Sequence, residues 1–297
     1  MKLWTGLVAL LILTGCGKQA ETSYEPEFAP RVVSGKHFIV GILPQHNVQR
    51  LMELNVGLVE QINTAIPEAH FEMEASRSFE EFEKKLFAGH FDFAMLNPYQ
   101  TILSLKYGYR VFAKMGDDAI FHGIVLVRKD SGVNKITDLK GKRVAYPANT
   151  ALAAGLMPQY YFHTNGIDVN RDIENVYVGS QESAIMNVVL GHTVAGATWP
   201  PPWKRFNVEH PDLASQLEVK WETPPLLNNG WVVRNNVDAD IAAKFGNVLV
   251  NLDKSEQGKK ALAPLLVSRF ERADDATYEP VRKFLKQFSA TVRPVEQ

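Results

Sequence analysis

The feature that most restricts the fold is an alternation of short apolar segments with amphipathic segments, which runs through the chain twice. The first run begins with a strand-like segment at 37–44, and apolar residues at helical spacing follow over 48–66. The pattern restarts with the strand-like segment 142–147 and the helical segment 151–164. Such alternation predicts an α/β protein whose sheets are mainly parallel and flanked by helices.

Two similar strand segments divide the chain. GIVLVRKDSGV at 123–133 and GWVVRNNVDAD at 230–240 share a glycine, an apolar run and an arginine. Because they bracket the second run, we expect an inserted second lobe, although chance similarity between buried strands would look the same. The predicted parts are lobe one, first part (36–125), lobe two (126–223), and the return to lobe one (224–297). A chain of 297 residues can supply cores for two lobes.

The N-terminal segment is typical of an export signal rather than of the fold. Residues 1–15 combine Lys2 with a short apolar run, which predicts a signal peptide. Leu13-Thr14-Gly15-Cys16 resembles a bacterial lipobox, and Cys16 is the single cysteine of the chain. We therefore predict lipidation at Cys16 and a polar tether over 16–35. A plain signal peptide with an incidental cysteine is the alternative.

The sequence offers few tools for catalysis. The eight histidines form no metal-binding spacing, and the chain has no nucleophile elbow, P-loop or dinucleotide fingerprint. A net charge of −1 without a basic run argues against nucleic acid as a partner. These observations favour a binding protein with no catalytic residue, metal or cofactor.

Several segments carry a resemblance to a known family. DFAMLNPY (92–99), DSGVNKITDLKGKRVAYP (130–147), VGSQESAIMNVVLGHTVAGATW (178–199) and ADDATYEPVRKFLKQF (273–288) closely resemble the phosphate, phosphite and phosphonate (PhnD-like) solute-binding lipoproteins of ABC transporters. The resemblance covers nearly the whole mature chain. It implies the type II periplasmic-binding fold, in which two α/β lobes close over a ligand in the cleft between them.

The resemblance also implies a set of ligand-binding residues. The family's Ser-Thr-Ser turn, whose hydroxyl and N–H groups hold anionic oxygens, corresponds here to Ala151-Leu152-Ala153, just after Thr150. Its Gly-His pair corresponds to Gly179-Ser180, followed by Gln181. The remaining predicted contacts from lobe one are Gln45, His46, Phe79, Asn97 and Tyr99. The lost hydroxyls and histidine predict a larger or less charged ligand, or a phosphonate held mostly by the backbone.

The segment Trp199-Pro200-Pro201-Pro202-Trp203 follows a predicted strand at 193–199. Ligands of open α/β sheets bind at the carboxyl ends of the strands. We therefore expect a proline-stiffened loop at the cleft, with Trp199 and Trp203 as flat apolar walls. The alternative is that the tryptophans belong to the core of lobe two and the prolines only end the strand.

Together these features predict a monomeric receptor, anchored by lipid in the bacterial cell envelope, that delivers a small molecule to an ABC permease. A ligand-sensing subunit of a membrane signalling system uses the same fold and remains an alternative. An enzyme is the third alternative, for which Glu182 is the only plausible acid or base.

Overall fold

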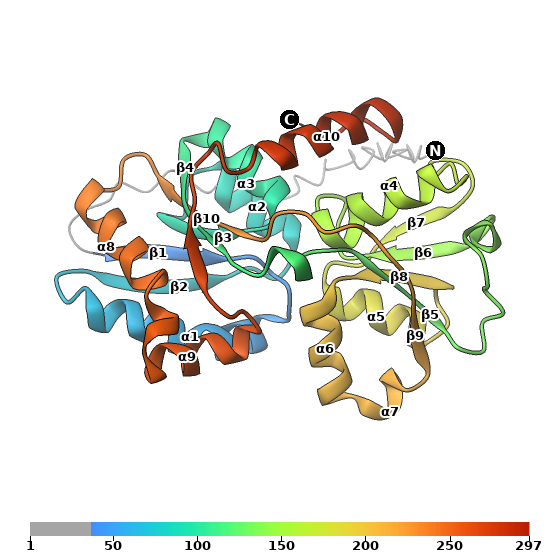
Figure 1. Ribbon diagram of the computed structural model, residues 1–297, viewed down its shortest axis with the longest axis horizontal. Helices are drawn as coiled ribbons and strands as arrows, with labels where there is room; N and C mark the ends of the chain where they lie inside the picture. The colour runs from blue at the N-terminus through green and yellow to red at the C-terminus, as the bar shows by residue number, and fades with distance from the viewer. Residues whose placement is uncertain (1–36, 297) are drawn as a thin grey trace, which may run out of the picture.

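The computed structural model describes residues 37–296 and consists of two α/β lobes side by side (Figure 1). The predicted signal peptide, Cys16 and the tether lie outside the described residues. Within residues 37–296, no helix is long and apolar enough to cross a bilayer. The prediction of a two-lobed α/β fold is confirmed.

Lobe one is built on a six-stranded sheet with the order β11-β4-β10-β3-β1-β2. Its strands are β1 (His37–Ile42), β2 (His70–Ala75), β3 (Phe93–Leu96), β4 (Tyr109–Met115), β10 (Gly230–Arg234) and β11 (Phe270–Arg272). Its helices are α1 (Val48–Ala65), α2 (Phe79–Phe87), α3 (Pro98–Ser104), α8 (Ala239–Leu249) and α9 (Glu256–Leu262).

Lobe two is built on a five-stranded sheet with the order β7-β6-β8-β5-β9. Its strands are β5 (Ile124–Arg128), β6 (Arg143–Tyr146), β7 (Glu174–Tyr177), β8 (Ala195–Thr198) and β9 (Leu217–Glu222). Its helices are α4 (Met157–Thr164), α5 (Gln181–Val189), α6 (Pro200–Glu209) and α7 (Pro211–Ala214). A π-helical turn, Leu152–Leu156, precedes α4. The helix expected over 151–164 therefore forms over 152–164, and its first turn is π-helical.

The two similar strand segments of the sequence are the strands that cross between the lobes. β10 pairs antiparallel with β3 and β4, and β5 pairs antiparallel with β8 and β9. Each carries a register shift at the equivalent place, after Trp231 and after Val125. The sheets are therefore mixed rather than mainly parallel. A strand arriving from the other lobe enters its sheet in the opposite direction, and β11 also pairs antiparallel with β4. Ile124 and Val125 accordingly belong to the second sheet, not to lobe one.

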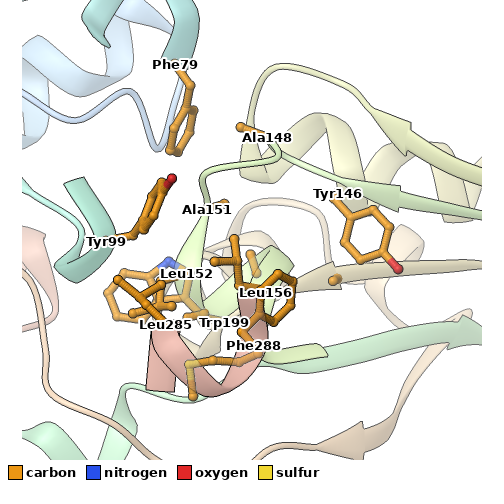
Figure 2. Close-up of a cluster of buried hydrophobic side chains, with 14 of the residues drawn as sticks. Phe79, Tyr99, Tyr146, Ala148, Ala151, Leu152, Leu156, Trp199, Leu285 and Phe288 are labelled. Atoms are coloured by element: carbon orange, nitrogen blue, oxygen red, sulfur yellow. The ribbon is translucent and has the colours of Figure 1, made fainter. Parts of the chain in front are cut away.

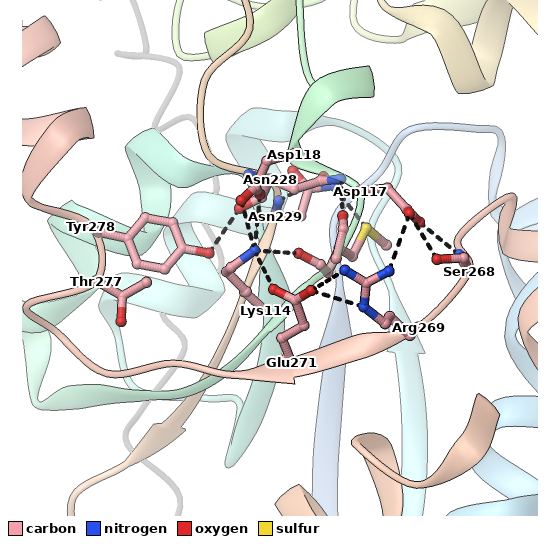
Figure 3. Close-up of polar contacts among 12 residues, drawn as sticks. Lys114, Asp117, Asp118, Asn228, Asn229, Ser268, Arg269, Glu271, Thr277 and Tyr278 are labelled. Carbon is pink, nitrogen blue, oxygen red and sulfur yellow. Dashed lines mark hydrogen bonds and ion pairs between the residues drawn. The ribbon is translucent and has the colours of Figure 1, made fainter. Parts of the chain in front are cut away.

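The two crossing segments, 116–123 and 223–229, are hydrogen-bonded to each other. Gly123 N donates to Thr223 Oγ1 at 2.9 Å, and Thr223 N donates to the Gly123 carbonyl at 2.9 Å. At the lobe-one end, Asp118 accepts from Asn228 N and from the buried ammonium of Lys114 (Figure 3). The two crossings therefore form one two-stranded connection, and the ion pair between Asp118 and Lys114 fixes it to lobe one.

The C-terminal helix α10 (Glu279–Thr291) lies in the segment assigned to the return to lobe one, and it also contacts lobe two. It packs on α3 of lobe one, and in Figure 1 it extends across the top of the molecule toward α4 of lobe two. Phe284 packs edge-on against Tyr160 at 5.6 Å, and Asn170 Nδ2 donates to the Val292 carbonyl at 2.7 Å. The chain end thus makes a third connection between the lobes, because its apolar face finds partners in both.

Candidate functional site

A cleft lies where strands of both lobes end. Leu43 follows β1, Asn97 follows β3, and Trp199 follows β8. The turn 148–154 follows β6 from the side of lobe two. This is the place where open α/β sheets bind ligands, because the carboxyl ends of parallel strands leave a crevice there.

The central cavity of the cleft is small and mostly apolar. Its volume is about 20 Å³, which is space for a water molecule, so the lobes must part to admit a larger ligand. Its polar side chains are Gln45, Asn97, Gln181 and Asn229, and among the described residues no charged side chain lines it. The rest of the lining consists of Leu43, Phe79, Phe121, Ala151, Leu152, Ala153, Ala154 and Trp199.

Aromatic side chains of lobe one meet the apolar turn of lobe two across the cleft. In Figure 2, Phe79 and Tyr99 of lobe one lie next to Ala151 and Leu152 of lobe two. All four belong to one cluster of buried side chains that is continuous between the lobes. Burial raises the pKa of Tyr99 to about 12, so its phenol stays protonated at neutral pH. The closed arrangement is thus held largely by apolar contact.

The backbone of the turn Leu152–Leu156 is the main source of hydrogen-bond donors at the cleft. The first N–H groups of a helical segment have no intrahelical acceptor, and they attract anions. Ala151 provides no side-chain cap to them. Ala151, Leu152, Ala153 and Ala154 all line the cavity.

The other helix starts at the cleft have fewer donors to offer. In α3, Pro98 has no N–H, and Asn97 Oδ1 already accepts from Tyr99 N and Gln100 N. In α6, the first three helical residues are prolines. In α5, the Ser180 hydroxyl accepts from Ser183 N at 3.1 Å. Phe79 begins α2 and also lines the cavity, and the Ser78 hydroxyl accepts from Glu81 N. An anion in the cleft would therefore depend on the turn at 152–155 and on the first N–H groups of α2 and α5.

A carboxylate lies close to the same turn. Glu83 of α2 accepts a hydrogen bond from Gln100 Nε2 at 2.8 Å. Burial raises the pKa of Glu83, whereas the hydroxyl of Thr150 and the amide of Gln100 lower it. Asn97 Nδ2 donates to the Thr150 carbonyl at 3.2 Å and so joins the lobes. The acidic group beside Thr150 makes this side of the cleft unfavourable for a dianion.

The structure brings most of the predicted site residues together. Gln45, Phe79, Asn97, Ala151, Leu152, Gln181 and Trp199 line the central cavity. Tyr99 and Thr150 lie beside it, and His46 lines the neighbouring compartment described below. Ser180 instead caps its own helix, and Gln181 Oε1 accepts from Thr198 Oγ1 at 2.8 Å.

The triple proline is not the stiff loop that the sequence suggested. Pro200, Pro201 and Pro202 form the first turn of α6, with Trp199 as N-cap. Proline fits there because the first helical N–H groups have no acceptor in any case. The first turn rotates Trp203 away from the cleft, onto Phe206 in a small cluster of lobe two. Trp199 lines the central cavity and also belongs to the buried core, since its side chain is only 4% exposed.

A second interlobe space, the side compartment, lies next to the central cavity. Its lining includes His46 and Asn55 from lobe one and Trp199, Pro201 and Arg205 from lobe two. Sequence reasoning missed Asn55 and Arg205. The one available signal was that Asn55 interrupts the apolar face of the helix at 48–66.

Charged groups join the two lobes beside the side compartment. Arg50 of α1 forms an ion pair with Glu209 of α6, and Arg205 of α6 donates to the Pro264 carbonyl of lobe one. Arg205 Nη1 also lies 3.5 Å from Glu209 Oε1. His46 sits among these groups, and burial followed by the Arg205 charge lowers its pKa to about 4.

We expect the closed arrangement to weaken in mild acid. Because the pKa of His46 is lowered from 6.5 to about 4 in the closed form, the open form binds a proton first as the pH falls. The contribution of His46 to closure is therefore complete above about pH 6.5 and is lost towards pH 4.

X-ray scattering should show the radius of gyration rising over this range, and rising less in His46→Gln. Glu209, Glu182 and His210 also face this region, so only the difference between the two proteins reports on His46. Identical curves would contradict the assignment.

The described residues contain no group of histidine, cysteine, aspartate and glutamate side chains suited to hold a metal ion. The site therefore consists of a mostly apolar cleft between the lobes, lined in part by the start of a helical turn. That arrangement can enclose a small molecule, and it presents no nucleophile with an adjacent base.

Comparison with known proteins supports this description. The family model of the ABC transporter phosphonate periplasmic substrate-binding proteins matches residues 40–278. A probable ABC transporter phosphite-binding protein of Prochlorococcus marinus is 25% identical over 186 residues, which are 58% of this chain and 63% of that protein. The phosphonates-binding periplasmic protein of Escherichia coli is 24% identical over 169 residues, which are 55% of this chain and 49% of that protein. The matches thus span less than two thirds of both relatives.

Solved structures show the same fold. A binding-protein component of an ABC phosphonate transporter from Pseudomonas aeruginosa has a TM-score of 0.80 at 18% identity, covering 87% of this chain and 88% of that one. The methylphosphonate complex of the Prochlorococcus marinus protein PhnD1 has a TM-score of 0.78 at 19% identity, covering 86% and 98%. These relatives are binding proteins and not enzymes, as the sequence predicted for this chain. Because its family model spans most of the two lobes, the chain belongs to the family of periplasmic substrate-binding proteins of phosphonate ABC transporters.

Proposed function

We propose that this protein is the extracytoplasmic receptor of an ABC importer, and that its ligand carries less negative charge than phosphate or a phosphonate. Family membership supports the role of receptor. The observation that carries the choice of ligand is the lining of the central cavity. That lining contains four polar, uncharged side chains and no arginine, lysine or histidine among the described residues.

The energetic reason is the cost of burying charge. A phosphonate dianion gives up strong hydration on entering a closed cleft, and only several charge-assisted hydrogen bonds offset that loss. Here the first turn of α6 has no N–H to give, the α3 donors are already bonded, and Glu83 lies beside Thr150. A neutral or weakly charged molecule with apolar surface fits Phe79, Leu152 and Trp199 better.

Native mass spectrometry of protein purified without refolding tests this choice directly. We expect a retained compound that is neutral or carries at most one negative charge at pH 7. A retained phosphate, phosphite or simple alkylphosphonate would overturn the ligand assignment and leave the receptor role intact. Loss of the signal on denaturation is the control for specific retention.

We further propose that the receptor is anchored to the membrane by lipid at Cys16. The support is the signal-like segment before Cys16 and the absence of any other cysteine in the sequence. Radiolabelled palmitate should enter the wild-type protein in its host, and Cys16→Ser should abolish labelling and release the protein from membranes. A serine variant that still labels and resists high-salt washing would show that the anchor lies elsewhere.

A sensor role has one observation in its favour. A histidine kinase sensor domain with similarity to periplasmic binding proteins shares the fold, with a TM-score of 0.58, 19% identity, and coverage of 79% of this chain and 98% of that one. Crosslinking in intact cells distinguishes the two roles. We expect a permease subunit in the crosslinked product, and a kinase there instead would favour sensing.

A further inference from the structure

The side compartment continues the central cavity rather than forming a separate site. Leu43, Gln45 and Trp199 line both spaces. The volume of the side compartment is about 40 Å³ in the closed arrangement. Its apolar walls are Leu51, Leu54, Met95, Met115, Pro201, Pro264, Leu265 and Leu266. A ligand that extends from the central cavity past Trp199 therefore enters a narrow space with mostly apolar walls.

One polar atom in this space has no partner. Asn55 lies on the buried face of α1 and is 2% exposed. Its Nδ2 donates to the Leu51 carbonyl at 2.9 Å, which fixes the orientation of the amide. The opposite atom, Asn55 Oδ1, is buried and accepts no hydrogen bond from the described residues. Buried acceptors are normally paired, so this one calls for a donor that the protein does not supply.

The charges around the compartment are already compensated. Arg205 donates to the Pro264 carbonyl and lies 3.5 Å from the Glu209 carboxylate. His46 is neutral at physiological pH, because its pKa is lowered to about 4. An ionic group entering the compartment would thus find no unpaired opposite charge, which favours an uncharged donor.

We infer that the ligand site extends past Trp199 into the side compartment, where Asn55 accepts a hydrogen bond from an uncharged hydroxyl or amide N–H at the end of an apolar chain. This inference rests on the proposed function, because the same ligand occupies the central cavity. It makes Asn55 a residue that determines ligand length and chemistry. A resident water bonded to Asn55 is the competing explanation.

Two matched series of probes test the inference. Straight-chain alcohols and the α,ω-diols of the same length differ only in the terminal hydroxyl. We expect the wild-type protein to bind the best diol about tenfold more tightly than its alcohol, as one added hydrogen bond allows. Asn55→Leu, which removes the acceptor at similar volume, should abolish that preference. Binding is measured by ligand-observed NMR at millimolar probe.

The matched control is Asn187→Leu in α5. Asn187 Nδ2 makes the same kind of bond, to the Ser183 carbonyl at 2.8 Å, on the helix of lobe two. This variant should keep the diol preference. A preference that survives Asn55→Leu, equal binding of both series, or no binding of either would overturn the inference. A change in melting temperature with the preference intact would assign Asn55 to a resident water. Native mass spectrometry decides the proposed function separately, since it needs no probe.

Discussion

Replacing Trp199 with alanine should lower the free energy of unfolding by about 3–5 kcal/mol, the range for a buried aromatic side chain. Trp199 is 4% exposed, its ring lies 5.4 Å from that of Phe121, and it forms a wall of both interlobe spaces. Affinity for the natural ligand should also fall by about 1–3 kcal/mol, because an aromatic anchor is lost. Urea denaturation measures the first effect, and calorimetry with the co-purified compound measures the second.

Trp203→Ala is the matched control. Trp203 stacks on Phe206 in the small cluster of lobe two, so its loss should reduce stability and leave affinity nearly unchanged. Thr150→Ala and Ser180→Ala should reduce the affinity for the natural ligand less than Trp199→Ala does. If Trp199→Ala unfolds the protein, Trp199→Phe retains enough volume to report on affinity. Unchanged affinity in a folded Trp199 variant would contradict the role of this residue as a ligand wall.

Gly123→Ala should be strongly destabilising and should also impair binding. A Cβ at Gly123 would lie 2.3 Å from the Ala153 carbonyl oxygen and 2.8 Å from Pro158 Cγ. A backbone carbonyl cannot swing aside as a flexible side chain can, so the first crossing or the turn 152–156 must shift. Overpacking of this kind costs about 1–3 kcal/mol, and more where the backbone must move. Displacing the turn also moves Leu152, Ala153 and Ala154, which line the cavity.

Gly57→Ala provides the same chemical change without the clash. Gly57 lies within α1, and a Cβ there would meet Ala261 at 3.6 Å, an ordinary contact. The free energy of unfolding of that variant should rise by up to about 1 kcal/mol, as expected when alanine replaces glycine in a helix interior. Thermal unfolding of the two variants, with calorimetry on the natural ligand, checks both expectations. Wild-type stability in Gly123→Ala would show that the turn is looser than the structure indicates.

Much of the fold could be predicted because local patterns and long-range topology agree in this chain. The strand-like segments became strands, and the similar segments at 123–133 and 230–240 became the crossing strands β5 and β10. Their antiparallel pairing could not be read locally, because it depends on the direction from which each strand enters the other lobe. The position of α10 over both lobes could not be predicted either, because the apolar face of a helix does not identify the elements that pack against it.

The candidate site was predictable only in part. The resemblance placed Phe79, Asn97, Leu152 and Trp199 at the cleft, and all four line the central cavity. It could not show that the Ser180 hydroxyl caps its own helix, since that depends on local backbone geometry. The prolines were read as a loop because three in succession usually interrupt structure, yet the first turn of a helix tolerates them. That one difference turned Trp203 away from the cleft.

Calorimetric titration of the wild-type protein with inorganic phosphate and with methylphosphonate, at pH 7 and physiological salt, tests most directly the claim that this cleft selects ligands of low charge. Protein freed of ligand by unfolding and refolding is compared with protein as purified. We predict little or no binding of either anion at millimolar concentration. Micromolar or tighter binding that survives Trp199→Ala and is lost in Thr150→Ala would contradict the claim, and would show that the turn after Thr150 holds an anion.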